Sequence, residues 1–255
     1  MGYSSDILWH QTTKNGFKNI LKSSMFKCSY SLESINWKSS NRTFAIPMIS
    51  FCNLALSDLG EYLCKYGDYT IGMKKSWKFA SKTSLVWYRD KNSISLHPLM
   101  DYYKKIQKIS FLETDSEREA LVWTQLCYTK NYEGPLKRRG IKCYRFFDEF
   151  EFRYVPNIDI LSSEKVIPIL TEDEYIKYKE ENRTSVINKE TLGLKFDIED
   201  IEYILVKDKG QIGNVSTILN KYLNKDSNKS GRKPIILTYD EVRRNIIGID
   251  HHKYE

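Results

Sequence analysis

An alternation of aromatic and charged side chains in the segment Phe146–Pro156 constrains the fold more than any other feature of this sequence. Side chains of a β-strand point to opposite faces with a period of two, and aromatic residues favour a half-buried strand surface. The alternation predicts a strand whose aromatic face packs on the core. Its charged face is expected to be either a solvated, self-paired edge or a chemical site. The two faces consist of Phe150, Phe152 and Tyr154, and of Glu149, Glu151 and Arg153.

Short strand-like and helix-like segments follow one another irregularly along the chain, which favours an α+β fold over a doubly wound parallel sheet. Residues 131–140 are expected to form a basic loop, and residues 224–234 a flexible linker. The expected strands lie at residues 7–12, 45–52, 68–74, 84–89 and 201–206. The expected helices begin near residue 13 and lie at residues 57–66, 97–109, 116–129, 172–181 and 215–223, with a strand and a helix in residues 235–247.

The amino-acid composition limits the classes of protein to which this chain can belong. The chain has 255 residues, of which 41% are hydrophobic and 29% are charged, which is ordinary for a globular protein. It has no apolar run of membrane-spanning length, and its first residues lack the pattern of a signal peptide. The five cysteines form no C-x-x-C pair, which argues for reduced thiols and against a structural zinc site. We therefore expect a cytoplasmic protein that holds no metal.

The net charge of +7 favours a polyanionic partner, so nucleic acid (RNA or DNA) is a candidate. Four basic side chains immediately before the alternating segment are the expected contacts, with a solvated basic loop as the alternative. They are Lys137, Arg138, Arg139 and Lys142.

Several segments resemble known families. Trp9-His10-Gln11-Thr12, followed by a helical pattern, is similar to the opening of many ADP-ribosyltransferases. Segments 46–52, 65–77, 132–134, 147–156 and 200–206 resemble, in this order, the AbiGi family of abortive phage-infection proteins. The resemblance implies an ADP-ribosyltransferase-like split β-sheet core with flanking helices over residues 1–207. Residues 208–255 would form a C-terminal extension.

The same resemblance implies a site that takes NAD as substrate. Cleaving the bond between nicotinamide and ribose creates positive charge on the sugar, and a carboxylate stabilises that charge. Glu151 is the expected catalytic carboxylate, and Glu149 the expected base for the acceptor. Taken singly, the other residues are more commonly structural, and only their order along the chain supports a site. The expected NAD contacts are His10, Thr12, Ser50, Phe51, Tyr66, Tyr69 and Arg153.

Two functions of different classes follow. The first is an NAD-dependent ADP-ribosyltransferase that acts as the toxin of a phage-defence system and modifies nucleic acid, with a cognate antitoxin or chaperone as a candidate partner. The alternative is a non-catalytic antitoxin or binding partner in an abortive-infection system. Release of nicotinamide from NAD distinguishes the two.

Overall fold

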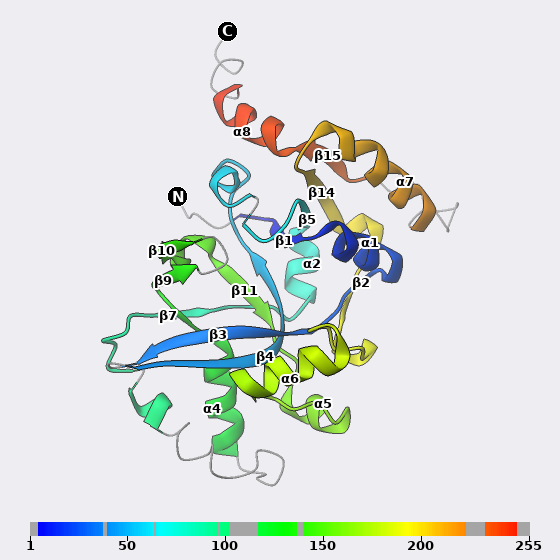
Figure 1. Cartoon of the computed structure of the whole chain (residues 1–255). Helices are drawn as coiled ribbons and strands as arrows, with labels where there is room; N and C mark the ends of the chain where they lie inside the picture. Colours follow the sequence, from blue (N-terminus) through cyan, green and yellow to red (C-terminus); the bar gives the residue numbers. More distant parts are fainter. Residues whose placement is uncertain are drawn as a thin grey trace. The chain divides into compact units, whose positions relative to one another are not determined.

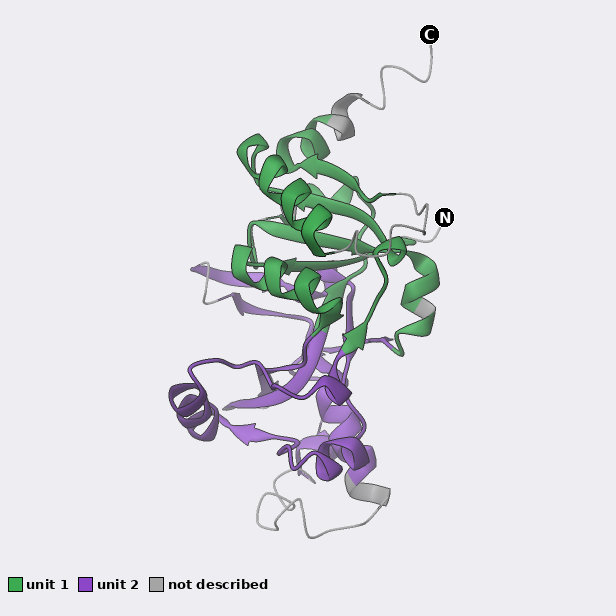
Figure 2. Ribbon diagram, turned by 90° about the vertical axis from the view of Figure 1, so that its right-hand side faces the viewer, with its two compact units in different colours: residues 1–26, 50–82, 194–255 green, residues 27–49, 83–193 purple. Residues whose placement is uncertain are grey.

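The computed structural model describes residues 5–37, 40–63, 65–95, 97–101, 117–136, 140–222 and 233–248. Strands and helices alternate irregularly in these residues, which confirms the predicted α+β class. The chain forms two compact units, shown in Figure 2. Unit 1 consists of residues 1–26, 50–82 and 194–255, and unit 2 of residues 27–49 and 83–193. The boundary expected after residue 207 stays a prediction.

The sheet of unit 1 brings distant parts of the sequence together (Figure 1). Its strands follow the order β15 (Ile235–Thr238), β14 (Ile201–Val206), β5 (Tyr69–Met73) and β1 (Leu8–Thr12). The last residue of β4 (Ser40–Cys52) pairs with β1. β14 and β15 run parallel, whereas β5 is antiparallel to both of its neighbours.

Two longer helices of unit 1 carry the amphipathic patterns that predicted them. Helix α1 (Lys14–Ser23) begins after Thr13, whose side chain accepts a hydrogen bond from the backbone of Gly16, and it buries Phe17, Ile20 and Leu21. Helix α7 (Ile212–Tyr222) buries Val215 and Leu219. The remaining helices are α2 (Lys75–Ala80), α8 (Tyr239–Gly248) and the 3₁₀ turns Asp58–Glu61, Ile198–Asp200 and Lys209–Gln211.

An aromatic cluster lies beside a small antiparallel pair, β2 (Met25–Phe26) and β13 (Leu194–Lys195). The ring of Phe26 contacts those of Phe51, Trp77 and Phe196 at centroid distances of 5.2, 5.6 and 5.1 Å. This cluster joins the three chain segments of unit 1 through side-chain packing.

Unit 2 is built on a long hairpin. Strand β3 (Ser29–Trp37) is antiparallel to β4, from Ser29 opposite Met48 to Trp37 opposite Ser40. Strand β12 (Leu170–Thr171) also pairs with β4. Strand β11 (Glu151–Tyr154) pairs with β6 (Ser84–Leu85). β6 is the last strand in the order of that sheet.

Two further strand pairs and several helices belong to the described part of unit 2, in which residues 97–101 are also helical. Helix α6 (Glu172–Asn182) begins with a capping box in which Thr171 and Glu174 exchange hydrogen bonds. The strand pairs are β7 (Trp87–Arg89) with β8 (Thr129–Asn131) and β9 (Glu133–Leu136) with β10 (Ile141–Arg145). The helices are α4 (Glu117–Tyr128), α5 (Ile158–Ser163) and α6 (Glu172–Asn182), with 3₁₀ turns at Phe146–Glu149 and Glu190–Leu192.

Several predicted elements need correction. The helix expected from Ser57 is one 3₁₀ turn, and the side chain of Ser57 makes no capping hydrogen bond. The expected strand 84–89 is divided into β6 and β7, and part of the expected basic loop forms β9. Strand β3 was not predicted. Residues 97–101 are helical as expected, whereas residues 102–109 of the helix expected at 97–109 lie outside the described residues. Residues 224–232 of the expected linker also lie outside them.

The prediction for the alternating segment is wrong in two respects. Its first four residues form a 3₁₀ turn, and Phe150 follows in the left-handed conformation with φ of 42°, so the strand begins only at Glu151. The predicted faces are also reversed. Glu151 and Arg153 are buried, with 5% and 0% of their surface exposed, whereas Phe152 is only half-buried. The reversal has a physical cause, because the buried charges are paired in the site described below.

Gly72 permits a close approach in the core of unit 1. It lies directly opposite Trp9 on the neighbouring strand, and a Cβ atom at Gly72 would lie 2.5 Å from the buried indole ring. We expect Gly72→Ala to lower the free energy of unfolding by about 1–3 kcal/mol, as overpacking of a core does. Chemical denaturation of the purified protein measures this loss.

Gly213 provides the matched control. A Cβ atom there would have no heavy atom of the described structure within 4 Å, and the position lies in helix α7. Gly213→Ala is expected to leave stability unchanged or to raise it by up to about 1 kcal/mol. Equal stability of the wild type and Gly72→Ala would contradict the proposed packing of Trp9.

Candidate functional site

The alternating segment contributes a buried guanidinium to unit 2. Arg153 donates from Nε to Oε1 of Glu151 at 2.7 Å and from Nη2 to Oε2 of the same carboxylate at 3.2 Å. Nη2 also donates to Oε1 of Glu33 at 2.7 Å, and Nη1 donates to the carbonyl of Cys127 at 2.7 Å. Three different chain segments therefore hold one side chain that has no exposed surface.

A second cation enters the same group. Nζ of Lys130 contacts Oε2 of Glu151 and lies 3.5 Å from Oε2 of Glu149. The buried charge cluster consequently contains three carboxylates and two cations: Glu33, Glu149, Glu151, Lys130 and Arg153. The structure thus brings the two expected catalytic acids together, although Glu149 lies in a 3₁₀ turn rather than on the strand.

The surroundings shift the pKa values of Glu151 and Glu33 in opposite directions. Burial alone would raise the pKa of Glu151, but the charges of Arg153 and Lys130 outweigh it and lower this pKa to about 2. Burial raises the pKa of Glu33, and Arg153 offsets only part of that effect. Burial would lower the pKa of Lys130, but the surrounding carboxylates raise it well above its usual range. Glu151 and Lys130 are therefore held as ions.

Local structure sets the positions of these groups. Helix α4 contains Cys127 in its last turn, ends at Tyr128 and is followed directly by β8, which carries Lys130. Asn131, the next residue, donates from its side chain to the carbonyl of Ser34 and accepts from the backbone N–H of Asn36, so that β8 is fixed to β3 and to Glu33. Hydrogen bonds between residues of β3, β8 and β11 thus hold the cluster in place.

Aromatic side chains flank the cluster. The hydroxyl of Tyr88 accepts a hydrogen bond from the backbone N–H of Glu151 at 2.7 Å. The ring of Phe147 contacts the rings of Tyr88, Tyr132 and Phe150 at centroid distances of 5.2–5.3 Å. The left-handed Phe150 therefore packs beside Phe147 and turns the chain into β11.

Six of the expected NAD contacts lie in unit 1. Nδ1 of His10 lies 2.9 Å from the carbonyl of Ser50, and the imidazole is 5.5 Å from the ring of Phe51. Burial lowers the pKa of His10, and its hydrogen bond to Ser50 only partly counteracts this. The imidazole is therefore neutral at pH 7. It also packs edge-on against Phe26.

The other three residues of this group lie near the end of β1. Thr12 pairs with Tyr69, and Tyr69 is buried and stacked on Phe17 at 5.0 Å. The backbone N–H of Tyr66 donates to the side chain of Gln11, and its ring lies 5.7 Å from that of Tyr62.

The structure places the expected site in two separate groups. His10, Thr12, Ser50, Phe51, Tyr66 and Tyr69 belong to unit 1, whereas Glu149, Glu151 and Arg153 belong to unit 2. The roles expected for these residues in binding NAD and in catalysis stay predictions.

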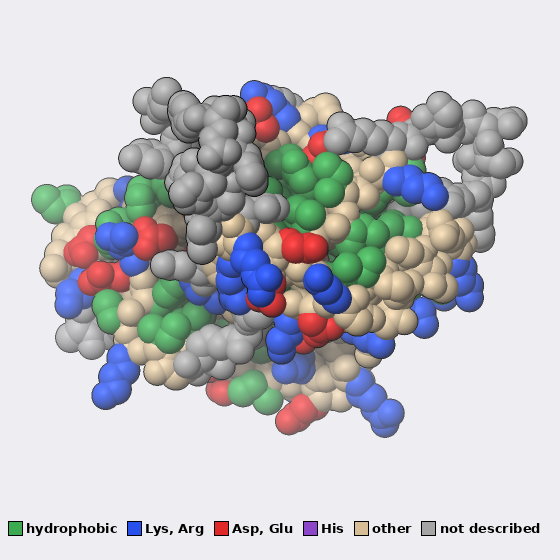
Figure 3. Space-filling view, turned by 90° about the horizontal axis from the view of Figure 1, so that it is seen from above, with side chains coloured by type: hydrophobic (Ala, Val, Ile, Leu, Met, Phe, Trp, Pro, Cys, Tyr) green, Lys and Arg blue, Asp and Glu red, His purple; other side chains and the backbone are tan. Residues whose placement is uncertain are grey.

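The expected nucleic-acid contacts are described only in part. Lys142 is exposed on β10, and residues 137–139, which include Lys137, Arg138 and Arg139, lie outside the described residues. Among the described side chains seen in Figure 3, basic residues lie beside acidic and apolar ones. A nucleic-acid partner stays a prediction.

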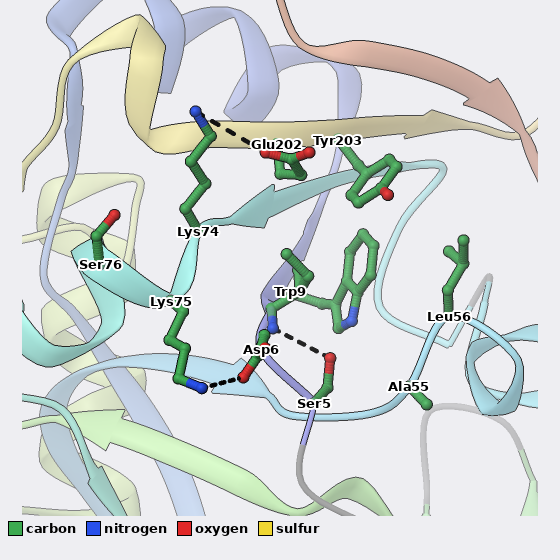
Figure 4. Close-up of a pocket in the computed structure, with 11 residues that line it drawn as sticks. Ser5, Asp6, Trp9, Ala55, Leu56, Lys74, Lys75, Ser76, Glu202 and Tyr203 are labelled. Carbon is green, nitrogen blue, oxygen red and sulfur yellow. Dashed lines mark hydrogen bonds and ion pairs between the residues drawn. The ribbon is translucent and has the colours of Figure 1, made fainter.

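A cavity of about 550 Å³ lies in unit 1 (Figure 4). The rings of Trp9 and Tyr203 lie 5.7 Å apart in its wall, and Trp9 donates from its indole to the carbonyl of Leu54. Its two lysines both have acidic partners: Nζ of Lys75 lies 2.7 Å from Asp6, and Nζ of Lys74 lies 3.8 Å from Glu202. Because these charges balance, the cavity suits an apolar group better than an anion.

The sequence analysis missed two members of the cluster. Glu33 lies in a strand that was not predicted, and Lys130 follows an expected helix end among many surface lysines. The apolar residues of β3 show no sustained period-two alternation, because Ile35 is out of phase with Tyr30 and Leu32. No local pattern marks Lys130, because its partners are 19 and 21 residues away in the sequence.

A family described as abortive phage resistance protein AbiGi, antitoxin, has a model that matches residues 23–207. The chain belongs to the AbiGi family. The match contains all of unit 2 and the whole buried charge cluster. No curated protein and no solved structure matches the chain.

The family description corrects the first functional hypothesis. The expectation of an ADP-ribosyltransferase toxin is wrong, because the matching AbiGi model is described as an antitoxin, which agrees with the alternative hypothesis. The resemblance to AbiGi itself is confirmed.

Two further findings concern the described residues only. They include no group of three or more His, Cys, Asp or Glu side chains arranged to hold a metal ion. No helix among them is long and apolar enough to cross a membrane.

The lowered pKa of Glu151 predicts how stability depends on pH. Because the unfolded chain binds this proton more tightly than the folded protein, Glu151 stabilises the fold above its ordinary pKa of 4.5. The contribution disappears as the pH falls from 4.5 to about 2. Glu151→Gln is expected to be about 3 kcal/mol less stable than the wild type at pH 7 and to approach it near pH 2. Denaturant unfolding measured between pH 7 and pH 2 tests this.

An exposed carboxylate on α6 gives the control. Glu180→Gln should leave the free energy of unfolding within about 0.5 kcal/mol of the wild type across this range, as surface substitutions do. The pKa of Glu33 is raised, so its contribution is lost as the pH rises and has the opposite sign. The charge of Glu151 contributes to the raised pKa of Glu33, so the difference between wild type and Glu151→Gln at each pH reports both effects of removing this charge. A pH-independent difference would contradict the assigned ion pairs.

Proposed function

We propose that this protein is an antitoxin of an abortive-infection system that acts without catalysis, by binding the toxin as a protein. The family match carries the proposal, since it spans residues 23–207 and its description names an antitoxin. The likeness of the sheet to an ADP-ribosyltransferase core stays a prediction on which the proposal does not depend.

The chemistry of the cluster supports a non-catalytic role. Both carboxylate oxygens of Glu151 accept hydrogen bonds from Arg153, and one also meets Lys130. A carboxylate that stabilises a developing cation must turn its charge toward the substrate. Here the charge of Glu151 is directed to cations of its own chain, and the carboxylate is almost fully buried. The cluster therefore serves the fold of unit 2.

The proposal predicts a rescue of growth. We would express each gene that flanks this one in its genome, alone and together with this protein. One flanking gene is expected to arrest growth, and co-expression of this protein is expected to restore it, because a bound toxin is inactive. This protein expressed alone should leave growth and the cellular NAD concentration unchanged. Growth curves and a cellular NAD assay provide the two measurements.

A stop-codon variant tests whether the protein or its messenger RNA causes the rescue. The same gene with a stop codon in place of Trp9 produces the RNA but no folded chain, so it should fail to rescue. The purified pair should also elute together as a complex in gel filtration. Growth arrest or NAD loss caused by this protein alone would overturn the proposal. Rescue by the stop-codon gene would do so as well.

A further inference from the structure

The buried charge cluster of unit 2 contains more acids than cations. If all five groups were ionised, three carboxylates would face the two cations Lys130 and Arg153 and leave a net charge of −1. No more than 14% of any of these five side chains is exposed. An uncompensated charge is costly in such a place, and a buried acid avoids the cost by binding a proton.

Two of the three carboxylates have several partners that compensate a negative charge. Glu151 accepts hydrogen bonds from Nε and Nη2 of Arg153 and contacts Nζ of Lys130. Glu149 lies 3.5 Å from the same Nζ and is hydrogen-bonded to the side chain of Tyr144. Hydrogen bonds from donors favour the ionised form of a carboxyl group.

Glu33 has the weakest compensation of the three. Among the described residues it accepts one hydrogen bond, at Oε1 from Nη2 of Arg153, and this nitrogen also donates to Glu151. Oε2 of Glu33 accepts no hydrogen bond from a described residue. A carboxylic acid can accept at one oxygen while it holds a proton on the other. The geometry therefore selects Glu33 as the acid that takes up the proton.

The surroundings of Glu33 oppose its ionisation. Burial is the largest effect and raises its pKa, the charges of Arg153 and Lys130 offset part of this, and those of Glu151 and Glu149 raise the pKa again. On β4, the residue opposite Glu33 is the apolar Phe44. Burial also raises the pKa of three titratable neighbours of the cluster, which are therefore neutral at pH 7: Tyr88, Tyr144 and Cys127.

We propose that Glu33 holds a proton in the folded protein at pH 7, and that loss of this proton weakens the attachment of β3 to β11. With the proton bound, two carboxylates face two cations, and the hydrogen bond from Arg153 to Oε1 is kept. Without it, a third negative charge enters the buried site. The inference concerns a pH-sensitive contact within unit 2 and does not rest on the proposed antitoxin function.

Nuclear magnetic resonance of the glutamate carboxyl carbons tests the proposal in the wild-type protein. The signal that is absent from Glu33→Gln identifies Glu33, and its chemical shift reports whether the carboxyl group is protonated. At pH 7 the signal is expected to be that of a neutral acid, and it should become that of a carboxylate only at higher pH. An ionised Glu33 in the folded wild type at pH 7 would overturn the proposal.

Backbone amide signals test the structural consequence. Those of β3, residues 29–37, should shift with the same midpoint as the Glu33 carboxyl signal, because β3 carries this residue. Those of α7 in unit 1 should not follow this midpoint. A titration of Glu33 that leaves the amide signals of β3 unchanged would refute the link between the proton and the attachment of the strand.

Removal of a neighbouring charge tests the charge balance. In Glu151→Gln two carboxylates remain for two cations, so the titration midpoint of Glu33 should move to lower pH than in the wild type. Glu180→Gln is the matched control, because it removes an exposed carboxylate of the same unit, and it should leave this midpoint unchanged. A midpoint that stays the same in Glu151→Gln would contradict the argument from charge.

The stability of Glu33→Gln provides an independent test. Because the folded protein binds the Glu33 proton more tightly than the unfolded chain, stability is lost as the pH rises above 4.5. Glutamine has no such proton to lose and keeps an oxygen for Arg153. The variant should therefore unfold at a higher urea concentration than the wild type at pH 7, and the two should converge near pH 4.5. A variant that is less stable than the wild type at pH 7 would overturn the proposal.

Discussion

The placement of Arg153 inside unit 2 is the constraint on which the rest of that unit depends. A guanidinium with no exposed surface needs partners for its donors, because an unpaired buried charge costs several kcal/mol. Glu151, Glu33 and the carbonyl of Cys127 provide them from β11, β3 and the end of α4. Each of these elements must therefore stand in one position. The ion pairs fix the arrangement of the strands more than they add to stability.

This constraint also explains the reversed strand. Once Glu151 and Arg153 point inward, the period of two in a β-strand forces Phe152 outward. Phe152 is then half-buried instead of belonging to the core. The alternation in β11 consequently specifies an internal charge network.

Local patterns predicted the elements whose signals are complete within one segment. Helix α6 has its Thr171 and Glu174 capping box, and β14 is an apolar run of strand length bounded at residues 201 and 206 as expected. The Glu-rich segment was identified as a strand, but its orientation was not predictable. Period-two alternation gives two faces and does not say which one is buried. That choice depends on Lys130 and Glu33, which are distant in sequence and complete the charge pairing.

The crystal structure of the complex between this protein and its toxin tests the central claim most directly. The account predicts that the toxin binds as a protein and that Glu151 keeps its hydrogen bonds to Arg153 in the complex. A complex in which Glu151 turns away from Arg153 to contact the partner would contradict it.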